Sequence, residues 1–373
     1  MTPELSRLVD GVSRWARCES PTHDAGGVNA MMDLVAAEAS EAGIAFERIA
    51  GRDGLGDSLV LRAGPTLDRS GVLVLSHLDT VHPVGVAARD LPVRVEGDRL
   101  YGPGVYDMKG GAWLAFQAFK RVAASGAAKL PLVFLFTPDE EIGSPTSRSL
   151  IEREARRAAF ALVTEPARDG GRIVTSRKGV GRFEVAIEGR PSHAGTRHQD
   201  GRSAIHEAAL QIAALGSMTD YARGVTVTVG RISGGTAANV VPQHCVFSVD
   251  LRVVTGADGE EYERRLRAMR PIGPDMNLVV SGGMNRPPYE RSDAVAALFE
   301  TAREIAGRIG IDLREAPRSG GGSDGNFTAA LGVPTLDGLG VDGEGAHTLH
   351  EHAYISSIQP RLELMAGLLE ALR

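Results

Sequence analysis

Three short, uninterrupted apolar runs constrain the fold of this chain more than any other feature of its sequence. They cover residues 71–75, 130–136 and 159–164. Apolar runs of this length without alternation are typical of parallel strands that are buried on both faces of a sheet. A candidate helix, residues 111–124, lies between the first two runs. Strands that alternate with helices predict an α/β domain with a mostly parallel sheet and helices on both of its faces.

The pattern changes near residue 178. Apolar and polar residues alternate between residues 182 and 188, which is typical of a strand with one exposed face. The elements predicted after it are a helix at 203–215, strands at 225–232 and 246–254, a helix at 259–269 and a strand at 276–281. This order is that of a ferredoxin-like α+β domain. We therefore predict that residues 179–288 form an inserted domain, and that residues 1–178 and 289–373 together form the α/β domain.

The composition excludes several classes of protein. The chain has 373 residues, 43% hydrophobic and 24% charged, which suggests an ordinary globular protein of about two domains. A net charge of −6 without a basic block argues against partners such as nucleic acid or a membrane surface. No apolar run reaches the roughly 18 residues of a membrane helix. Two cysteines, Cys18 and Cys245, are too few for a disulfide framework, and the first residues lack an apolar signal core, so we expect a cytoplasmic protein.

Side chains that bind metals follow each predicted buried strand. The residues in question are His77 and Asp79, then Glu140 and Glu141, then Glu165, and finally His347 after a short strand near residue 336. Ligands of open α/β sheets bind beyond the carboxyl ends of the strands, so these side chains should meet at one edge of the sheet. Asp107 joins them from a glycine-rich loop just before a helix. Histidine and carboxylate ligands without cysteine suit zinc or a similar divalent ion.

The number of candidate ligands also fits two ions. One bridging carboxylate and two further ligands for each metal require five residues, and two-metal hydrolytic sites hold their ions about 3.5–4 Å apart. Each feature is common on its own, since adjacent glutamates are usually solvated and a His-x-Asp pair usually lies on the surface. Their coincidence at several strand ends carries the inference. The chain has no phosphate-binding loop of the Gly-x-x-x-x-Gly-Lys-Ser/Thr type, so a nucleotide-dependent function lacks support.

The segments around these residues are similar to a known enzyme family. They are residues 76–81, 102–111, 137–144, 164–166, 189–195 and 234–239, together with the region around His347. They resemble the dinuclear zinc peptidases and amidohydrolases that include glutamate carboxypeptidase, acetylornithine deacetylase and succinyl-diaminopimelate desuccinylase. The resemblance covers nearly the whole chain. Residues 164–166 and 176–181 and the form of the His347 region look most like the glutamate carboxypeptidase branch.

The resemblance implies a role for each candidate residue. It makes His77, Asp107, Glu141, Glu165 and His347 the metal ligands, with Asp107 bridging both metals. Asp79 would orient His77. Glu140 would be the general base, which takes a proton from an activated water and passes it to the leaving amine. In this family the peptide bond after the bridging aspartate is often cis, so we also expect a cis bond between Asp107 and Met108.

Two choices depend on the same resemblance. His350 and His352 lie close to His347, but the family pattern places a glutamate four residues after the ligand, as Glu351 follows His347.

The inserted domain would act as a lid or dimerisation domain. From it, His193 would stabilise the oxyanion, in dimeric relatives within the partner's site. Asn239, Arg252 and Arg286 would bind the substrate, although arginines here could instead form interdomain salt bridges.

Together these features predict a homodimeric enzyme with two divalent metal ions, zinc foremost, with cobalt or manganese as alternatives. It would hydrolyse an amide C–N bond in a small peptide or N-acyl amino acid, as a glutamate carboxypeptidase does. An N-deacylase of the acetylornithine deacetylase or desuccinylase type is the close alternative. A non-catalytic scaffold of the same fold is a further alternative, but the five ligands and Glu140 are all present, which argues against it.

Overall fold

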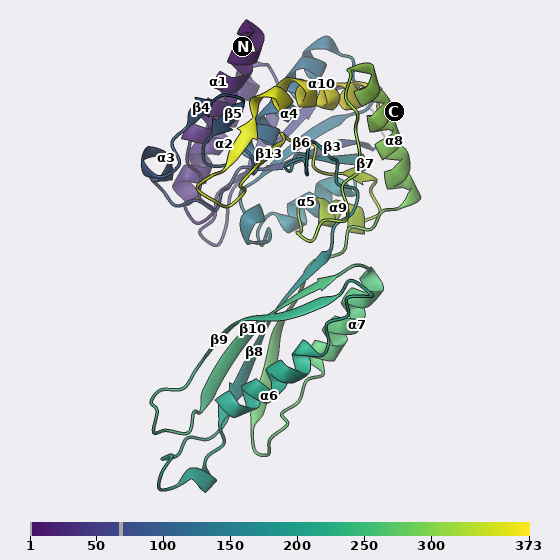
Figure 1. Cartoon of the computed structure of the whole chain (residues 1–373). Coiled ribbons are helices and arrows are strands. Elements are labelled where there is room, and N and C mark those ends of the chain that lie inside the picture. The colour runs from purple at the N-terminus through teal and green to yellow at the C-terminus, as the bar shows by residue number, and fades with distance from the viewer. Residues whose placement is uncertain (1, 67–69) are drawn as a thin grey trace. The chain divides into compact units, whose positions relative to one another are not determined.

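The computed structural model describes residues 2–66 and 70–373. The chain forms two compact units (Figure 1). The larger unit comprises Met1–Ser176, Arg291–Ser319 and Ser323–Arg373, and the smaller unit comprises Arg177–Glu290 with Gly320–Gly322. The glycines at 320–322 thus belong to the smaller unit although both of their neighbours in sequence belong to the larger one.

The larger unit is built on a six-stranded sheet in the order β1-β2-β6-β3-β7-β12. Its strands are β1 (Ala45–Ile49), β2 (Ser58–Ala63), β3 (Gly71–His77), β6 (Leu132–Thr137), β7 (Ala158–Val163) and β12 (Thr335–Leu336). The strands from β6 to β12 run parallel, while β1 and β2 are antiparallel additions at one edge. Every residue of β3 is buried, as expected for a strand covered on both faces. The predicted mostly parallel α/β domain is confirmed.

Helices cover both faces of this sheet (Figure 1). One face packs against α1 (Pro3–Arg17), α2 (Ala25–Glu41), α4 (Lys109–Ser125), α8 (Asp293–Arg308) and α10 (Ile355–Ala371), and the other against α5 (Arg148–Ala155) and α9 (Gly325–Ala330). Alternate side chains of β3 serve the two cores, since Val72 and Val74 lie in the first and Leu73 and Leu75 in the second. Among the described residues, none of the helices combines the length and the apolar character needed to cross a bilayer.

Several short elements complete the larger unit. They are α3 (Val86–Arg89), the 3₁₀ helix η1 (Glu140–Ile142), and a small sheet of β13 (Gly343–Glu344), β14 (His352–Tyr354), β5 (Arg99–Tyr101) and β4 (Arg94–Glu96). The N-terminal helix α1 is capped by Thr2, whose side chain accepts a hydrogen bond from the backbone N–H of Leu5, and Pro3 occupies its first turn.

The smaller unit has the predicted order of elements. It contains β8 (Gly179–Glu188), η2 (His198–Asp200), α6 (Ala204–Gly216), β9 (Thr226–Gly234), β10 (His244–Val253), α7 (Gly256–Arg267) and β11 (Asn277–Arg286). The four strands form an antiparallel sheet in the order β11-β8-β10-β9, and the two helices cover one face of it (Figure 1). This is the ferredoxin-like arrangement. The second helix begins three residues earlier than the sequence pattern indicates, because Thr255 caps it by accepting from the N–H of Asp258.

Candidate metal centre

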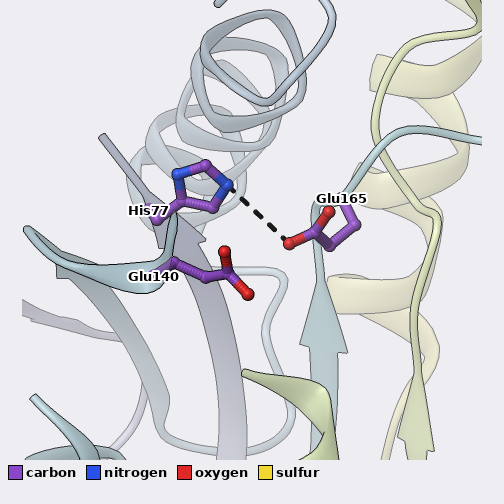
Figure 2. A group of neighbouring side chains, drawn as sticks. All are labelled: His77, Glu140 and Glu165. Carbon is purple, nitrogen blue, oxygen red and sulfur yellow. Dashed lines mark ion pairs between the residues drawn. The ribbon is translucent and has the colours of Figure 1, made fainter. Parts of the chain in front are cut away.

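Five segments bring the predicted ligands to one end of the larger unit's sheet. His77 is the last residue of β3, Glu141 lies in η1 directly after β6, and Glu165 follows β7. Asp107 comes two residues before α4, and His347 lies between β13 and β14. Figure 2 shows His77, Glu140 and Glu165 pointing toward one another from three of these segments. Buried parallel strands whose carboxyl ends carry polar residues therefore position the cluster.

Asp107 lies between two imidazoles. Its Oδ1 is 3.3 Å from His77 Nε2, and its Oδ2 is 3.3 Å from His347 Nε2. Each histidine also faces a carboxylate of its own. Glu165 Oε1 is 3.8 Å from His77 Nε2 (Figure 2), and Glu141 Oε2 is 3.1 Å from His347 Nε2. The cluster consequently divides into two sets of three residues that share the carboxylate of Asp107.

The donor set fits a divalent cation. Candidate ligand atoms of His77, Asp107 and Glu141 lie within 4.8 Å of one another, and so do those of His77, Glu140 and Glu165. Glu141 Oε1 is buried and has no hydrogen-bond partner among the residues that the structure describes. A buried oxygen of this kind costs free energy unless a donor or a cation compensates for it. A metal ion would supply that compensation.

The charges of the cluster shift its titration strongly. Hydrogen bonds to Asp107 and Glu141 raise the pKa of His347 to about 11. Burial disfavours the charged form of His77, but its contacts with Asp107 and Asp79 outweigh burial and raise its pKa well above the usual value. Burial would raise the pKa of Asp107, but the two histidines hold it below its ordinary range. The carboxylates thus favour the protonated histidines in the absence of a metal, whereas a metal binds the neutral imidazole, so metal binding would compete with protons.

Asp79 contacts both His77 and the turn that carries Glu140 and Glu141. It is fully buried, and its Oδ1 lies 3.4 Å from His77 Nδ1 while its backbone carbonyl lies 3.0 Å from the same nitrogen. With Nδ1 engaged in this way, Nε2 of His77 is the nitrogen that faces Asp107. The carboxylate of Asp79 also accepts the backbone N–H groups of Glu140 at 3.1 Å and Glu141 at 3.2 Å. One buried carboxylate therefore orients a candidate ligand and fixes the turn that carries both glutamates.

His347, rather than its two neighbouring histidines, lies in the cluster. His350 is exposed, and His352 packs its ring against Tyr101 and Tyr354, with ring centroids 5.2 and 5.3 Å away. The backbone of His347 is left-handed, with φ at 64°, which is uncommon for a residue with a side chain. The peptide bond between Asp107 and Met108 is cis, as the resemblance implied.

The smaller unit holds the remaining predicted residues. His193 is exposed, and its Nδ1 accepts the N–H groups of Gly195 at 3.1 Å and Thr196 at 3.2 Å. This pattern places the ring proton on Nε2, which is the state of an imidazole that can donate. Asn239 lies beside it, since its backbone carbonyl accepts from the N–H of Ala194 at 2.9 Å. The structure therefore brings His193 and Asn239 together.

The two predicted substrate-binding arginines lie elsewhere in the smaller unit. Arg252 directs its guanidinium at Asp250, with Nε–Oδ1 and Nη2–Oδ2 distances of 2.7 and 2.9 Å, and it also donates to the carbonyl of Gly320 at 3.3 Å. Arg286, at the end of β11, is only 4% exposed and its side chain packs closely against Gly322. Both arginines thus contact the glycine run at 320–322, and Arg252 already has a carboxylate partner.

Sequence reasoning missed two residues next to the cluster. Glu351 and His82 form a buried pair, with Oε2 and Nε2 2.7 Å apart, and Glu351 also accepts the backbone N–H of Asp107 at 3.0 Å. The sequence shows Glu351 four residues after His347, but this spacing served only to choose His347 among three nearby histidines and gave Glu351 no role. The presence of a second histidine shortly after the His77–Asp79 motif was a further signal.

Known proteins with similar sequences span almost the whole chain. Residues 73–371 match the model of peptidase family M20/M25/M40. Carboxypeptidase G2 of Pseudomonas sp. (strain RS-16) is 30% identical over 99% of this chain and 90% of its own length. Acetylornithine deacetylase of Myxococcus xanthus is 31% identical over 64% of this chain and 66% of its own.

Solved structures agree with this assignment at the level of the fold. Aminopeptidase PepT from Bacillus cereus superposes with a TM-score of 0.75 at 24% identity, and covers 98% of each chain. The M20 family metallo-carboxypeptidase Sso-CP2 from Sulfolobus solfataricus gives a TM-score of 0.74 at 17% identity, over 99% of each chain. With the family match over more than half of its length and a cluster of metal-binding side chains at the expected edge of the sheet, the chain belongs to the M20/M25/M40 family of metallohydrolases.

Proposed function

We propose that this protein hydrolyses the amide C–N bond of a small peptide or N-acyl amino acid in the manner of a glutamate carboxypeptidase. The observation that carries the proposal is the position of Asp107 between His77 and His347, each with a carboxylate of its own. This arrangement suits two divalent ions that share one carboxylate. Zinc fits a set of histidines and carboxylates, and cobalt or manganese could use the same ligands. The similarity to carboxypeptidase G2 over nearly the full length supports this choice of reaction.

The side chains of the centre divide the proposed reaction between them. Bound ions would lower the pKa of a water molecule and polarise the carbonyl of the substrate. Glu140 takes a proton from the attacking water and delivers it to the nitrogen of the leaving amine. Asp79 holds the backbone of Glu140 through a 3.1 Å hydrogen bond while it orients His77. The Nε2–H of His193 is the proposed donor to the oxyanion.

Specificity is proposed to reside in Asn239, Arg252 and Arg286. A substrate carboxylate that binds Arg252 side-on would have to displace Asp250, because the two oxygens of Asp250 already occupy the Nε–Nη2 edge of the guanidinium. Such an exchange would favour substrates with an acidic residue whose carboxylate can replace that of Asp250. N-deacylation is the second candidate, since a relative of 31% identity is an acetylornithine deacetylase.

A panel of substrates with defined metals tests the proposal. The full chain is stripped of metal with a chelator, reloaded separately with zinc, cobalt or manganese, and assayed for released amine. The substrates are dipeptides ending in glutamate or aspartate, acetylornithine and other acyl amino acids. We expect hydrolysis that disappears with the metal and returns on reloading, with the dipeptides ending in glutamate cleaved fastest. Activity that survives complete removal of metal would contradict the mechanism, and a protein that binds metal but cleaves nothing in the panel would favour the scaffold alternative.

A single substitution tests the proposed base. Glu140→Gln removes the proton acceptor while it preserves the shape of the side chain, so we expect kcat to fall by a factor of about 10²–10⁴. Metal content, measured by elemental analysis, should stay at the wild-type level. Glu304→Gln, at an exposed glutamate of α8, is the matched control and should behave as wild type. Unchanged turnover in the Glu140 variant would remove this residue from the proposed role.

We also propose that the enzyme is a homodimer that associates through its smaller unit and that it acts in the cytoplasm. The unit's sheet ends in the edge strand β9, on which Ile232 is 54% exposed. Exposed edge strands with apolar side chains favour pairing with another chain. Cys18 and Cys245 are free thiols, in keeping with a reducing compartment.

A further inference from the structure

A single buried carboxylate joins three of the segments that carry the candidate ligands. Glu351 is 1% exposed and accepts four hydrogen bonds. Its Oε1 accepts the backbone N–H groups of Tyr106 and Asp107, both at 3.0 Å. Its Oε2 accepts the N–H of Gly104 at 3.1 Å and lies 2.7 Å from Nε2 of His82. A carboxylate accepts but cannot donate, so His82 is the donor in this last contact.

These four donors lie on two segments of the chain, and each segment also carries a candidate ligand. Three belong to the loop that ends in the bridging residue Asp107, and one of them is the backbone N–H of Asp107 itself. The fourth belongs to His82, which follows His77 along the chain after β3. Glu351 in turn stands four residues after His347, in a loop closed by hydrogen bonds from the N–H groups of Thr348 and Glu351. The carboxylate therefore connects the segments of His77, Asp107 and His347.

His347 depends on contacts from other segments to keep its position. His347 is more exposed than the other ligands, with 53% of its side chain accessible, and its backbone is left-handed. A side-chain residue in that conformation persists only where the surrounding structure holds it. Glu351 is buried against the loop of Asp107 and so fixes the end of the segment in which His347 stands. Its bonds to the Asp107 loop thereby join the segment of His347 to the segment of Asp107.

We propose that Glu351 is a positioning residue whose bonds to Gly104, Tyr106, Asp107 and His82 determine how tightly the ion between His347 and Glu141 is held. This inference rests on the proposed function, because it assumes that the cluster binds metal. Glu351 acts through the ligands and has no role in contacting substrate. Residues that orient metal ligands in this way typically contribute about 10- to 100-fold to metal affinity.

The substitution Glu351→Gln tests the proposal in the full-length chain. Glutamine has nearly the same shape, but its NH₂ group must face either the Tyr106 and Asp107 N–H groups or the Gly104 and His82 donors. We titrate the metal-free protein with cobalt in the presence of a competing chelator, and follow the visible absorbance of the bound ion. The variant should bind its weaker ion about 10- to 100-fold less tightly than the wild type, with an altered cobalt spectrum.

Glu38→Gln is the matched control for a loss of stability alone. Glu38 is a buried glutamate of the same unit that accepts from Trp15 Nε1 at 2.8 Å and Lys120 Nζ at 3.3 Å. It should lower the melting temperature and leave cobalt affinity unchanged. Wild-type cobalt affinity in Glu351→Gln, together with a lowered melting temperature, would overturn the proposal. A wild-type chain that takes up no cobalt would instead overturn the proposed function itself.

A second pair of variants decides the matter if Glu351→Gln fails to fold. His82→Gln keeps a donor toward Glu351, whereas His82→Leu removes it without adding a charge. We expect His82→Leu to bind cobalt several-fold less tightly than His82→Gln. Equal affinity in the two variants would contradict the proposal, because the His82 contact would then play no part in holding the ligands.

Discussion

At the scale of single residues, two of the candidate ligands make contacts through both polar atoms of their side chains. Asp107 directs one oxygen at each histidine, and His77 directs its second nitrogen at Asp79. Few orientations satisfy all of these contacts at once. Asp107 and His77 are thereby oriented before any metal binds, which would reduce the free energy needed to organise the proposed centre on binding.

A pair of neighbouring histidines gives a direct test at this scale. His347→Ala removes a nitrogen that faces both Asp107 and Glu141, so we expect the variant to lose metal affinity and activity. His350→Ala alters an exposed residue three positions away and should retain both. Elemental analysis after dialysis against dilute zinc, with the wild type alongside, measures the difference. Equal metal content in the two variants would count against His347 as a ligand.

The sequence predicted that these residues lie together, which the structure shows, but it did not predict the hydrogen bonds that orient them. His77, Glu141 and Glu165 follow buried strands, so the strand pattern and the rule for ligands in α/β sheets locate them together. Glu351 and His82 are 269 residues apart, and nothing in the local sequence pairs them. Their bond follows from the path of two loops in space. Likewise, the pairing of Arg252 with Asp250 depends on side-chain orientation within one strand, which a sequence pattern leaves open.

At the scale of elements, Glu207 shows how one helix is fixed to a neighbouring loop. It lies in α6, is 1% exposed, and accepts the backbone N–H groups of Ile272 and Gly273 and the side-chain amide of Gln211, all at 2.8 Å. Burial would raise the pKa of this carboxyl, but these bonds hold it below its usual value. The ionised form is thus more favourable in the folded chain than in the unfolded one.

This shift predicts a specific pH dependence. A carboxyl group whose folded pKa is lowered stabilises the protein above the unfolded pKa of about 4.3, and the contribution is lost as pH falls through the lower folded value. Glu207→Gln should therefore reduce the free energy of unfolding by about 2 kcal/mol at pH 7. The difference from wild type should shrink below about pH 4. Urea denaturation at both pH values measures it, with the exposed Glu260→Gln as control. A difference that does not change with pH would contradict this account.

The hydrophobic pattern located the strands of the smaller unit better than it located their ends. The pattern located every strand of the smaller unit, because alternation continues along each buried face. It placed the end of the last strand at residue 281, whereas β11 continues to Arg286 alongside β8. Residues 282 and 283 are glycines, which weaken a strand signal in sequence, yet the ladder with β8 continues through them.

At the scale of the whole molecule, the dimer proposal links the two units through function. If His193 of one chain serves the centre of another, then neither Glu140→Gln nor His193→Ala homodimers would be active, but their mixture would be. We expect activity to return when the two inactive variants are mixed under conditions of subunit exchange. A mixture as inactive as its components would show that His193 does not act across the dimer.

The assembly itself has an independent measurement. Light scattering coupled to gel filtration should give about twice the 39.4 kDa of one chain for the wild type. Ile232→Lys places a charge on the exposed edge strand β9, which should shift the protein toward the monomer. Metal content of the variant should be unchanged, because Ile232 belongs to the smaller unit and the ligands to the larger one. A variant that stays dimeric would point to a different interface.

The distribution of the proposed ligands along the chain has a consequence for biosynthesis. They run from His77 to His347, so four of the five are synthesised well before the last one. While the ribosome is still producing the smaller unit, the set that contains His347 lacks its imidazole. A nascent chain can therefore not complete both halves of the centre during translation. If these residues bind two ions as proposed, loading of both must await release of the C-terminal segment, and a product truncated before residue 347 would lack a ligand of the ion that faces Glu141.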